Sequence, residues 1–206
     1  MQALFVHGMG RTPLSGWRLL RRLKQRGIST KTFSYFVSYE KFAGIKVRLV
    51  TELTIIAAEG EYIVIGHSLG GVILRGAINE LPKDVRKPSH LFLVGSPVAA
   101  SRMAKRFGKN ALFRLATSDC GQLLGSDDRM SAIPPTDIPK TAIIGIFKRR
   151  INPMFSPEEK NDGIVSIDEV TAEWLNDRAE VEMLHSFLTS SKRVAEIILE
   201  KIKFLN

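Results

Sequence analysis

Short apolar runs alternate along the chain with longer amphipathic segments. The short runs have the length and β-branched content of buried strands, and the longer segments have the length of helices. This pattern predicts strands at residues 3–7, 29–36, 62–66, 90–95, 140–147 and 179–184. It predicts helices at residues 13–26, 39–59, 69–81 and 187–204.

The order of these segments predicts an α/β fold. Strands that alternate with helices imply right-handed crossovers and a parallel sheet with helices on both faces. We expect one α/β domain, residues 1–206, built as a three-layer doubly wound sheet of about six parallel strands in the order 2-1-3-4-5-6.

One long stretch, residues 97–139, fits neither pattern. It contains a basic amphipathic segment, residues 101–115, and then a run rich in Gly, Ser and Asp, residues 117–131. A loop of this length in a compact domain is usually functional or mobile. We therefore expect an irregular insertion that forms a lid or one wall of a site.

The composition is that of a globular protein. The chain has 206 residues, of which 44% are hydrophobic, enough for one sizeable core. No apolar run has the length of a membrane span, and the N-terminus lacks the pattern of a signal peptide. Cys120 is the single cysteine, which excludes an internal disulfide. These features favour the cytoplasm, and a secreted protein without its leader is the alternative.

The formal net charge of +9 changes the range of partners to consider. The basic residues cluster at Arg18, Arg21, Arg22, Lys24 and Arg26, at Arg102, Lys105, Arg106 and Lys109, and at Lys148, Arg149 and Arg150. Such patches can attract anionic lipid or nucleic acid, and a solvated basic surface is the simpler explanation. The absence of interleaved aromatic and basic residues and of zinc-ligand spacing argues against nucleic acid.

Residues 62–71 read Tyr-Ile-Val-Ile-Gly-His-Ser-Leu-Gly-Gly. A G-x-S-x-G sequence between a buried strand and a helix is typical of the nucleophile elbow, a tight turn that exposes the serine hydroxyl. Glycines on both sides relieve contacts with the strand and the helix. This pattern predicts Ser68 as a nucleophile, and the alternative is a serine that only caps the helix.

A serine nucleophile needs a base and a group that orients the base. Of the four histidines, only His185 both follows Ser68 and stands at the carboxyl end of a predicted strand, where open α/β sheets place their sites. Asp162, before Gly163 in a tight turn, is the preferred acid. Its competitors are Asp168, Glu169, Glu158 and Glu159.

Two backbone N–H groups are expected to form the oxyanion hole. One belongs to Leu69, the residue after the nucleophile. The other belongs to Met9, in the glycine-containing segment His7-Gly8-Met9-Gly10 after the first strand. A plain glycine turn between strand and helix is the alternative for that segment.

Four segments carry a resemblance to the α/β-hydrolase superfamily, and within it to small lipases and esterases without a cap. They are Leu4-Phe5-Val6-His7-Gly8-Met9-Gly10, Gly66-His67-Ser68-Leu69-Gly70-Gly71, Asn161-Asp162-Gly163-Ile164-Val165-Ser166 and His185-Ser186-Phe187-Leu188. Gly95-Ser96-Pro97 is also similar to a turn of many lipases. The resemblance implies an ester hydrolase with Ser68, Asp162 and His185 as its triad. The first two strands of larger members are missing, and nothing in the resemblance matches residues 97–139.

The resulting hypothesis is a serine hydrolase that cleaves esters of acyl or lipid substrates through an acyl-enzyme, without metal or cofactor. A thioesterase or acyltransferase with the same triad, and a non-catalytic lipid-binding module, are the alternatives. An acyl groove is expected around Leu14, Trp17, Val98, Met103, Ile164 and Phe187, for which core packing is the competing explanation. Oligomeric state and head group are not encoded in these motifs.

Overall fold

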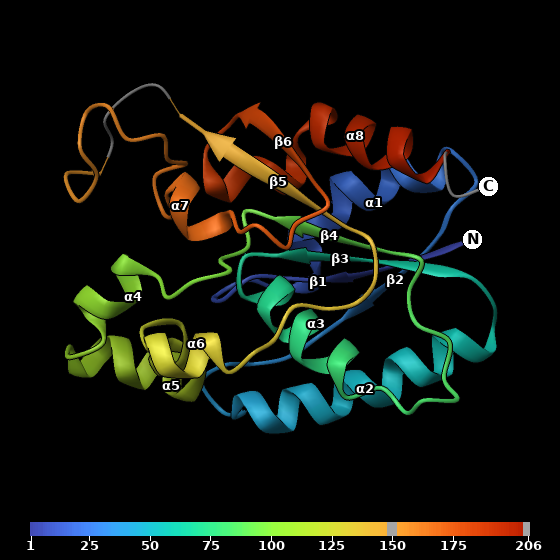
Figure 1. Ribbon diagram of the computed structural model, residues 1–206, viewed down its shortest axis with the longest axis horizontal. Coiled ribbons are helices and arrows are strands. Elements are labelled where there is room, and N and C mark those ends of the chain that lie inside the picture. The colour runs from blue at the N-terminus through green and yellow to red at the C-terminus, as the bar shows by residue number, and fades with distance from the viewer. Residues whose placement is uncertain (148–151, 204–206) are drawn as a thin grey trace.

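The computed structural model describes residues 1–147 and 152–203. Its centre is one six-stranded parallel sheet with the order β2-β1-β3-β4-β5-β6 (Figure 1), which confirms the predicted fold class and strand order. The strands are β1 (Gln2–Val6), β2 (Ser29–Phe33), β3 (Tyr62–His67), β4 (His90–Val94), β5 (Lys140–Ile146) and β6 (Asp177–Glu182).

The register of the sheet aligns the carboxyl ends of its central strands. Val6 of β1 is paired with Gly66 of β3, and His67 of β3 is paired with Val94 of β4. The residues that follow these strands therefore meet at one edge, which we call the strand-end edge. The arrow of β5 points toward this edge, on the left in Figure 1, and both labelled termini lie on the opposite side.

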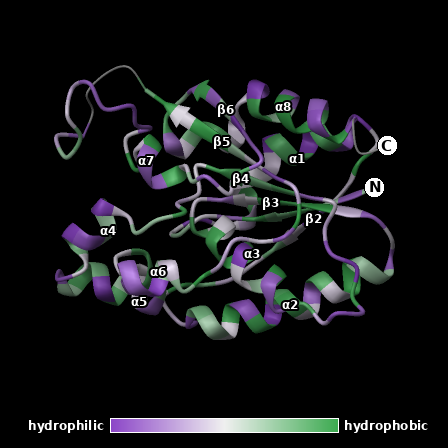
Figure 2. Cartoon of the chain, in the orientation of Figure 1, coloured by the Kyte–Doolittle hydropathy of each residue, from purple (hydrophilic) through white to green (hydrophobic). Residues whose placement is uncertain are grey.

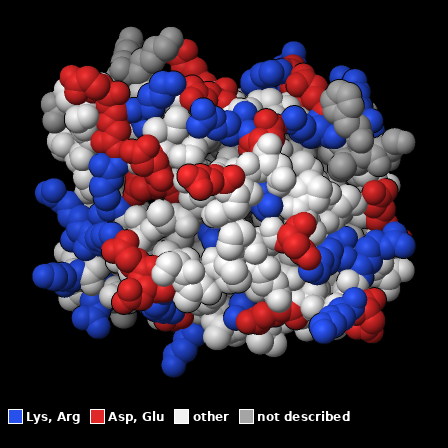
Figure 3. All heavy atoms as spheres, in the orientation of Figure 1, with Lys and Arg blue, Asp and Glu red and all other residues white. Residues whose placement is uncertain are grey.

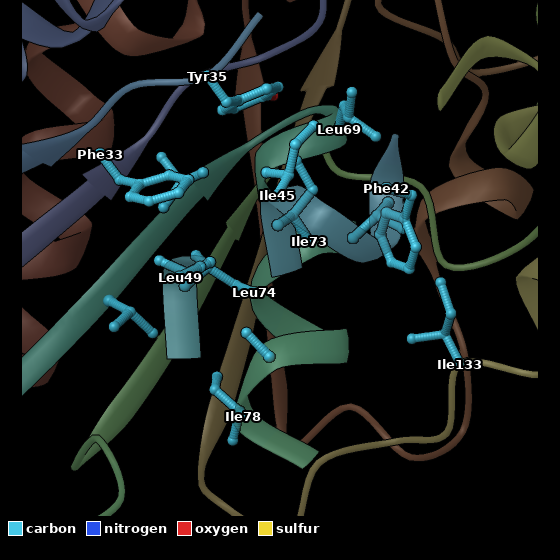
Figure 4. Packing of buried hydrophobic residues seen from close by; sticks show 14 of the residues in the cluster. Phe33, Tyr35, Phe42, Ile45, Leu49, Leu69, Ile73, Leu74, Ile78 and Ile133 are labelled. Atoms are coloured by element: carbon cyan, nitrogen blue, oxygen red, sulfur yellow. The ribbon is translucent and has the colours of Figure 1, made fainter. Parts of the chain in front are cut away.

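Two hydrophobic layers sandwich the sheet because alternate strand residues face opposite sides. One cluster joins Leu4, Val6 and Val64 to α2 (Phe42–Ala58) and α3 (Leu69–Asn79). Figure 4 shows side chains of these two helices interlocked beneath the sheet. The other cluster joins Ala3, Phe5 and Ile65 to α1 (Trp17–Lys24) and α8 (Lys192–Ile202). Figure 2 shows green apolar and purple polar residues on the helices that cover the sheet, with green also on the outer side of α2.

The two helices expected at the ends of the chain are shorter than the sequence indicates. A 3-10 turn, η1 (Pro13–Gly16), precedes α1, and a second one, η2 (His185–Ser190), precedes α8. Residue 204, the expected end of the last helix, and the basic cluster at residues 148–150 lie outside the described residues.

Residues 97–139 are largely helical, so the expectation of an irregular insertion is wrong. They form α4 (Arg102–Phe107), α5 (Ala111–Leu124) and α6 (Asp127–Ser131). Ser101, Asn110 and Ser126 cap these helices, each side chain accepting a backbone N–H three residues later. In this segment, therefore, several polar residues that suggested a loop instead cap helices. A further short helix, α7 (Ile167–Val170), follows β5.

No helix in the described ranges, 1–147 and 152–203, is long and apolar enough to cross a bilayer.

Candidate active site

Ser68 stands at the junction of β3 and α3 in a strained conformation. Its φ of 52° and ψ of −124° lie where residues other than glycine are uncommon. A Cβ atom on Gly66 would lie 2.4 Å from Gly71 Cα, and one on Gly70 would lie 2.2 Å from the Val6 carbonyl oxygen. The two glycines of the motif therefore allow the strand, the turn and the helix to approach one another, as the nucleophile elbow requires.

The structure brings Asp162 and His185 together at the strand-end edge. His185 Nδ1 lies 2.7 Å from Asp162 Oδ2, and both residues are buried. The other carboxylate oxygen, Asp162 Oδ1, accepts the N–H groups of Ile164 at 3.0 Å and Val165 at 2.9 Å. The backbone N–H of His185 also donates to the backbone carbonyl oxygen of Asp162, at 3.0 Å. The carboxylate is thus fixed by its own turn and directed at the imidazole.

Glycines at the ends of two strands leave room for this pair. A Cβ atom on Gly145 of β5 would lie 2.7 Å from Asp162 Cβ. One on Gly95, which follows β4 and has a φ of +54°, would lie 3.1 Å from His185 Nδ1. A side chain at either position would displace the pair, so both glycines belong to the architecture of the site.

The predicted hydrogen bond between nucleophile and base is not present among the described residues. No hydrogen bond joins Ser68 Oγ to His185 within the described part of the chain, so that bond stays a prediction. Hydrogen bonds of this kind are often long in ligand-free sites and tighten when substrate binds. Ser68 is partly exposed, whereas His67 before it and Leu69 after it are buried.

His67 contributes to the site in a way that the sequence reasoning missed. Its ring packs against that of His185 with centroids 4.9 Å apart, and its Nε2–H donates to the His185 carbonyl oxygen at 3.2 Å. Burial, reinforced by the neighbouring His185, lowers the pKa of His67 to about 3. His67 is therefore neutral near pH 7 and holds the main chain of the proposed base. The motif leaves this position variable, so only the structure reveals the contact.

The segment after β1 lies against the elbow. A Cβ atom on Gly8 would be 3.1 Å from Ser68 Cβ. Met9 is partly buried and packs on the core, and no turn, loop or cap hydrogen bond of the described chain uses the N–H of Met9 or Leu69. Both amides are therefore free of such partners, as oxyanion donors must be.

The four competing acids are either exposed or bound to other groups. Asp168 and Glu158 are exposed. Glu169 accepts the N–H groups of Arg102 and Ser166, and Glu159 pairs with the Arg102 guanidinium.

His7 stacks on Tyr35 with ring centroids 4.2 Å apart, and burial lowers its pKa. His90 contacts Thr141 Oγ1 at 2.9 Å, at the start of β4 and away from the strand-end edge. Within the described residues, no three His, Cys, Asp or Glu side chains gather as metal ligands would.

The expected acyl-groove residues are dispersed. Leu14 and Trp17 line a groove of about 660 Å³ between α1 and β2, and Ser68 is not part of its lining. Val98 is partly buried against the core, and Ile164 packs against a small cluster beside β5. Met103 is half-buried on α4, and Phe187 is exposed after His185. The structure therefore does not assemble these six side chains into one groove.

Comparison with known proteins supports the fold rather than a particular family. No protein-family model and no curated protein sequence matches the chain. Solved structures are similar over nearly its full length. The mature lipase BlEst2 of Bacillus licheniformis has a TM-score of 0.72 at 15% identity, covering 98% of this chain and 91% of the lipase.

Two other solved structures are similarly related. RedJ, a thioesterase of prodiginine biosynthesis in Streptomyces coelicolor, has a TM-score of 0.68 at 17% identity, covering 98% of this chain and 88% of RedJ. The methylesterase MES16 of Arabidopsis has a TM-score of 0.64 at 14% identity and covers 99% of both chains. The protein therefore has the α/β-hydrolase fold, and these neighbours are all hydrolases.

Proposed function

We propose that the protein is a serine hydrolase of carboxylic esters with acyl or lipid substrates. The observation that carries this proposal is the buried Asp162–His185 hydrogen bond at the strand-end edge, the edge where the strained Ser68 also stands. A carboxylate that orients a histidine at the same sheet edge as a partly exposed serine is consistent with the arrangement that activates a hydroxyl for acyl transfer. The similarity to a lipase, a thioesterase and a methylesterase supports the same class of reaction.

In the proposed reaction, Ser68 Oγ attacks the ester carbonyl carbon while His185 Nε2 takes the hydroxyl proton. Asp162 holds Nδ1–H and stabilises the imidazolium. The N–H groups of Met9 and Leu69 donate to the oxyanion, at the positive end of α3. His185 then protonates the leaving alkoxide, and water releases the acid from the acyl-enzyme by the same steps in reverse order.

The leaving group defines a second candidate. A thioester passes through the same acyl-enzyme, and the similarity to RedJ, a thioesterase, favours testing it. Comparing p-nitrophenyl butyrate with a butyryl thioester under the same conditions distinguishes the two activities.

The test of the proposal is labelling with a fluorophosphonate probe, together with hydrolysis of p-nitrophenyl esters. Ser68→Ala should abolish labelling and lower kcat/KM by several orders of magnitude. Ser29→Ala is the matched control, because Ser29 is exposed at the start of β2, at the end of the strand opposite the strand-end edge. An unlabelled wild-type protein would favour a non-catalytic lipid-binding module.

The acid is tested by a second matched pair. Asp162→Asn should lower kcat by a factor of about a thousand or more, because the amide cannot stabilise the imidazolium. Asp168→Asn should leave kcat within about threefold of wild type, since Asp168 is exposed. The reverse pattern would assign the acid to Asp168.

Peripheral contact with anionic membrane is part of the proposal. A hydrolase of lipid esters benefits from residence at a lipid surface, and the net charge of +9 favours an anionic one. Charge alone does not select a docking face.

A further inference from the structure

Most of the exposed large apolar side chains lie in segments that follow the carboxyl ends of strands. The structure describes ten exposed large apolar residues, and only Val47 and Ile55 lie on the outer face of α2. The other eight follow the carboxyl ends of β1, β2, β4 and β6, and they are Leu14, Trp17, Phe36, Tyr39, Phe107, Leu112, Leu115 and Phe187. Parallel strands share one direction, so each of these segments leaves the sheet at the strand-end edge that carries Ser68 and His185. Leu14 and Trp17 line the groove between α1 and β2.

The most protruding part is the α4–α5 arm, defined as residues 102–118. Leu112 and Leu115 on α5 are 76% and 75% exposed. The arm is fastened to the body by Phe113, which packs partly on the core and lies 6.1 Å from the ring of Phe107. The two leucines therefore project from an anchored helix, and no other side chain of the described chain covers them.

A kink explains why this part of α5 projects. Ser118, with φ 45° and ψ −135°, interrupts the helix. The segment before it is mostly exposed, whereas Cys120, Leu123 and Leu124 after it are buried. A non-glycine residue in this conformation is held there at a cost by its surroundings. The kink thus separates a buried half of the helix from a half that is free to contact a partner.

The charge of the arm is positive. Figure 3 shows Lys and Arg gathered over α4 and α5 at the left of the molecule. Arg102 pairs with Glu159, and Lys105 pairs with Asp127 at 2.7 Å. The other three cations, Arg106, Lys109 and Arg114, have no carboxylate partner among the described residues. They are available to an anionic partner.

A hollow of about 550 Å³ lies beside the exposed leucines. Its lining includes Lys109, Arg114, Leu115 and Ser118. Asp119 also lines it, but its carboxylate is already paired with Arg129 at 2.8 Å and accepts the Phe42 N–H at 2.9 Å. The hollow therefore offers two cations and a hydroxyl next to an apolar surface.

We infer that the α4–α5 arm is the element that docks the protein on anionic lipid. Leu112 and Leu115 enter the boundary of the acyl chains, while Arg106, Lys109 and Arg114 contact headgroups. Protruding apolar side chains among unpaired cations suit a deformable anionic surface, whereas a protein partner would require a matching recess. The inference specifies the membrane contact of the proposed function, and it orients the strand-end edge toward the lipid.

The experiment measures partition onto sedimented phosphatidylcholine vesicles with and without phosphatidylglycerol. A Ser68→Ala background keeps the lipids intact and makes the readout independent of catalysis. Binding should be much tighter to the anionic vesicles and should weaken as salt is raised. Leu112→Ser/Leu115→Ser should lower the partition coefficient at least about tenfold. Arg106→Gln/Arg114→Gln should lower it roughly 30-fold.

Two matched control variants test whether removing any exposed apolar pair, or any two positive charges, has the same effect. Val47→Ser/Ile55→Ser removes the two exposed apolar residues of α2, which lie outside the arm. Lys83→Gln/Arg86→Gln removes the same charge from the loop before β4, at the opposite edge of the sheet. Each control should change the partition coefficient by less than about threefold. Thermal unfolding of every variant checks that it folds.

Equal affinity for both kinds of vesicle, or equal losses in the control variants, would overturn the inference. It would also fail if the leucine variant turned a dimer into a monomer without changing vesicle binding, because the arm would then join two copies of the chain. If the wild-type protein bound vesicles but had no esterase activity, only the proposed function would be refuted. Active enzyme without vesicle binding would refute only the docking arm.

Discussion

His67 lies one residue before the proposed nucleophile and holds the main chain of His185. A carbonyl oxygen only accepts, so Nε2 carries a proton. Burial lowers the pKa of His67 to about 3, so the ring is neutral near pH 7. Its other nitrogen, Nδ1, is buried without a hydrogen-bond partner in the described structure. We interpret His67 as a positioning residue, which acts on the reaction through His185.

His67→Phe should lower kcat about tenfold with little change in KM, because one orienting hydrogen bond is lost. His67→Gln can present an N–H at a similar place and should recover most of the activity. Steady-state kinetics on p-nitrophenyl butyrate provides the measurement. Equal losses in both variants would mean that the ring acts only through packing.

The burial of His90 makes the stability of the fold depend on pH. Burial, with a smaller effect of Lys201, lowers the pKa of His90 to about 4, whereas the unfolded chain has the ordinary value near 6.5. Between these values the unfolded state binds the proton and the folded state does not. Its stabilising contribution is therefore complete above pH 6.5 and is lost as the pH falls toward 4.

The corresponding prediction concerns His90→Gln. Between pH 7 and pH 5, His90 should account for about 2 kcal/mol of the fall in the free energy of unfolding, and the variant should lack that part. Urea denaturation at the two pH values measures it. The buried His67 keeps a similar dependence in the variant and acts as an internal reference. Parallel curves for wild type and variant would contradict the assignment.

The residues of the site were predictable to different degrees. Ser68, Asp162 and His185 follow from the motif, from a turn and from position after a strand, and the structure joins the last two. The hydrogen bond from His67 to the His185 carbonyl oxygen was not predictable, because the motif gives only the spacing of nearby residues and does not show where residue 185 lies in the fold. The acyl-groove residues were chosen for apolar character alone, and this property does not distinguish a pocket from a core or a docking surface.

Two glycines in different elements have opposite expected effects. A Cβ atom on Gly66 in β3 would clash with the backbone of Gly71, so Gly66→Ala should destabilise the fold by roughly 3 kcal/mol or more. A Cβ atom on Gly44, exposed in α2, would meet nothing within 4 Å. Gly44→Ala should therefore stabilise the protein by about 0.5–1 kcal/mol.

Chemical denaturation of both variants measures these changes. Gly66→Ala should also lose fluorophosphonate labelling while Gly44→Ala keeps it, because only the first residue belongs to the elbow. A Gly66→Ala variant with full stability would show that the turn tolerates a side chain and that the close approach of strand and helix is not required.

The longest helix that the sequence reasoning missed is α5. Its buried residues Cys120, Leu123 and Leu124 lie beyond the kink at Ser118, so apolar spacing changes phase in the middle of the helix. A single helical period therefore fails to describe it, and the neighbouring Ser and Gly residues suggest a loop. Local composition cannot reveal a kink that tertiary packing holds in place.

The architecture of the whole molecule was the most predictable level. Apolar strands separated by helices allow few topologies, since right-handed crossovers restrict the sheet order. The order β2-β1-β3-β4-β5-β6 then places the ends of β1, β3, β5 and β6 at one edge. What the pattern could not show is the surface around that edge, because exposed apolar side chains have the same sequence signature as buried ones.

That surface supports a prediction about substrate length. With apolar residues around the strand-end edge, acyl chains should gain binding energy of about 0.8 kcal/mol for each buried methylene, or about fourfold in kcat/KM. We expect kcat/KM for p-nitrophenyl esters to rise from acetyl through butyryl to octanoyl until the contact surface is filled. Peptide substrates, which present polar amides to the same surface, should be cleaved weakly or not at all.

The series separates the surface from the catalytic machinery. Leu112→Ser/Leu115→Ser should leave hydrolysis of the soluble acetyl ester unchanged, because it removes docking side chains and no catalytic group. Its effect should appear with octanoyl esters presented in anionic vesicles, where residence at the surface limits the rate. A wild-type preference for acetyl over both longer esters would contradict an acyl-binding surface at this edge, since burial of apolar chain always favours the longer substrate.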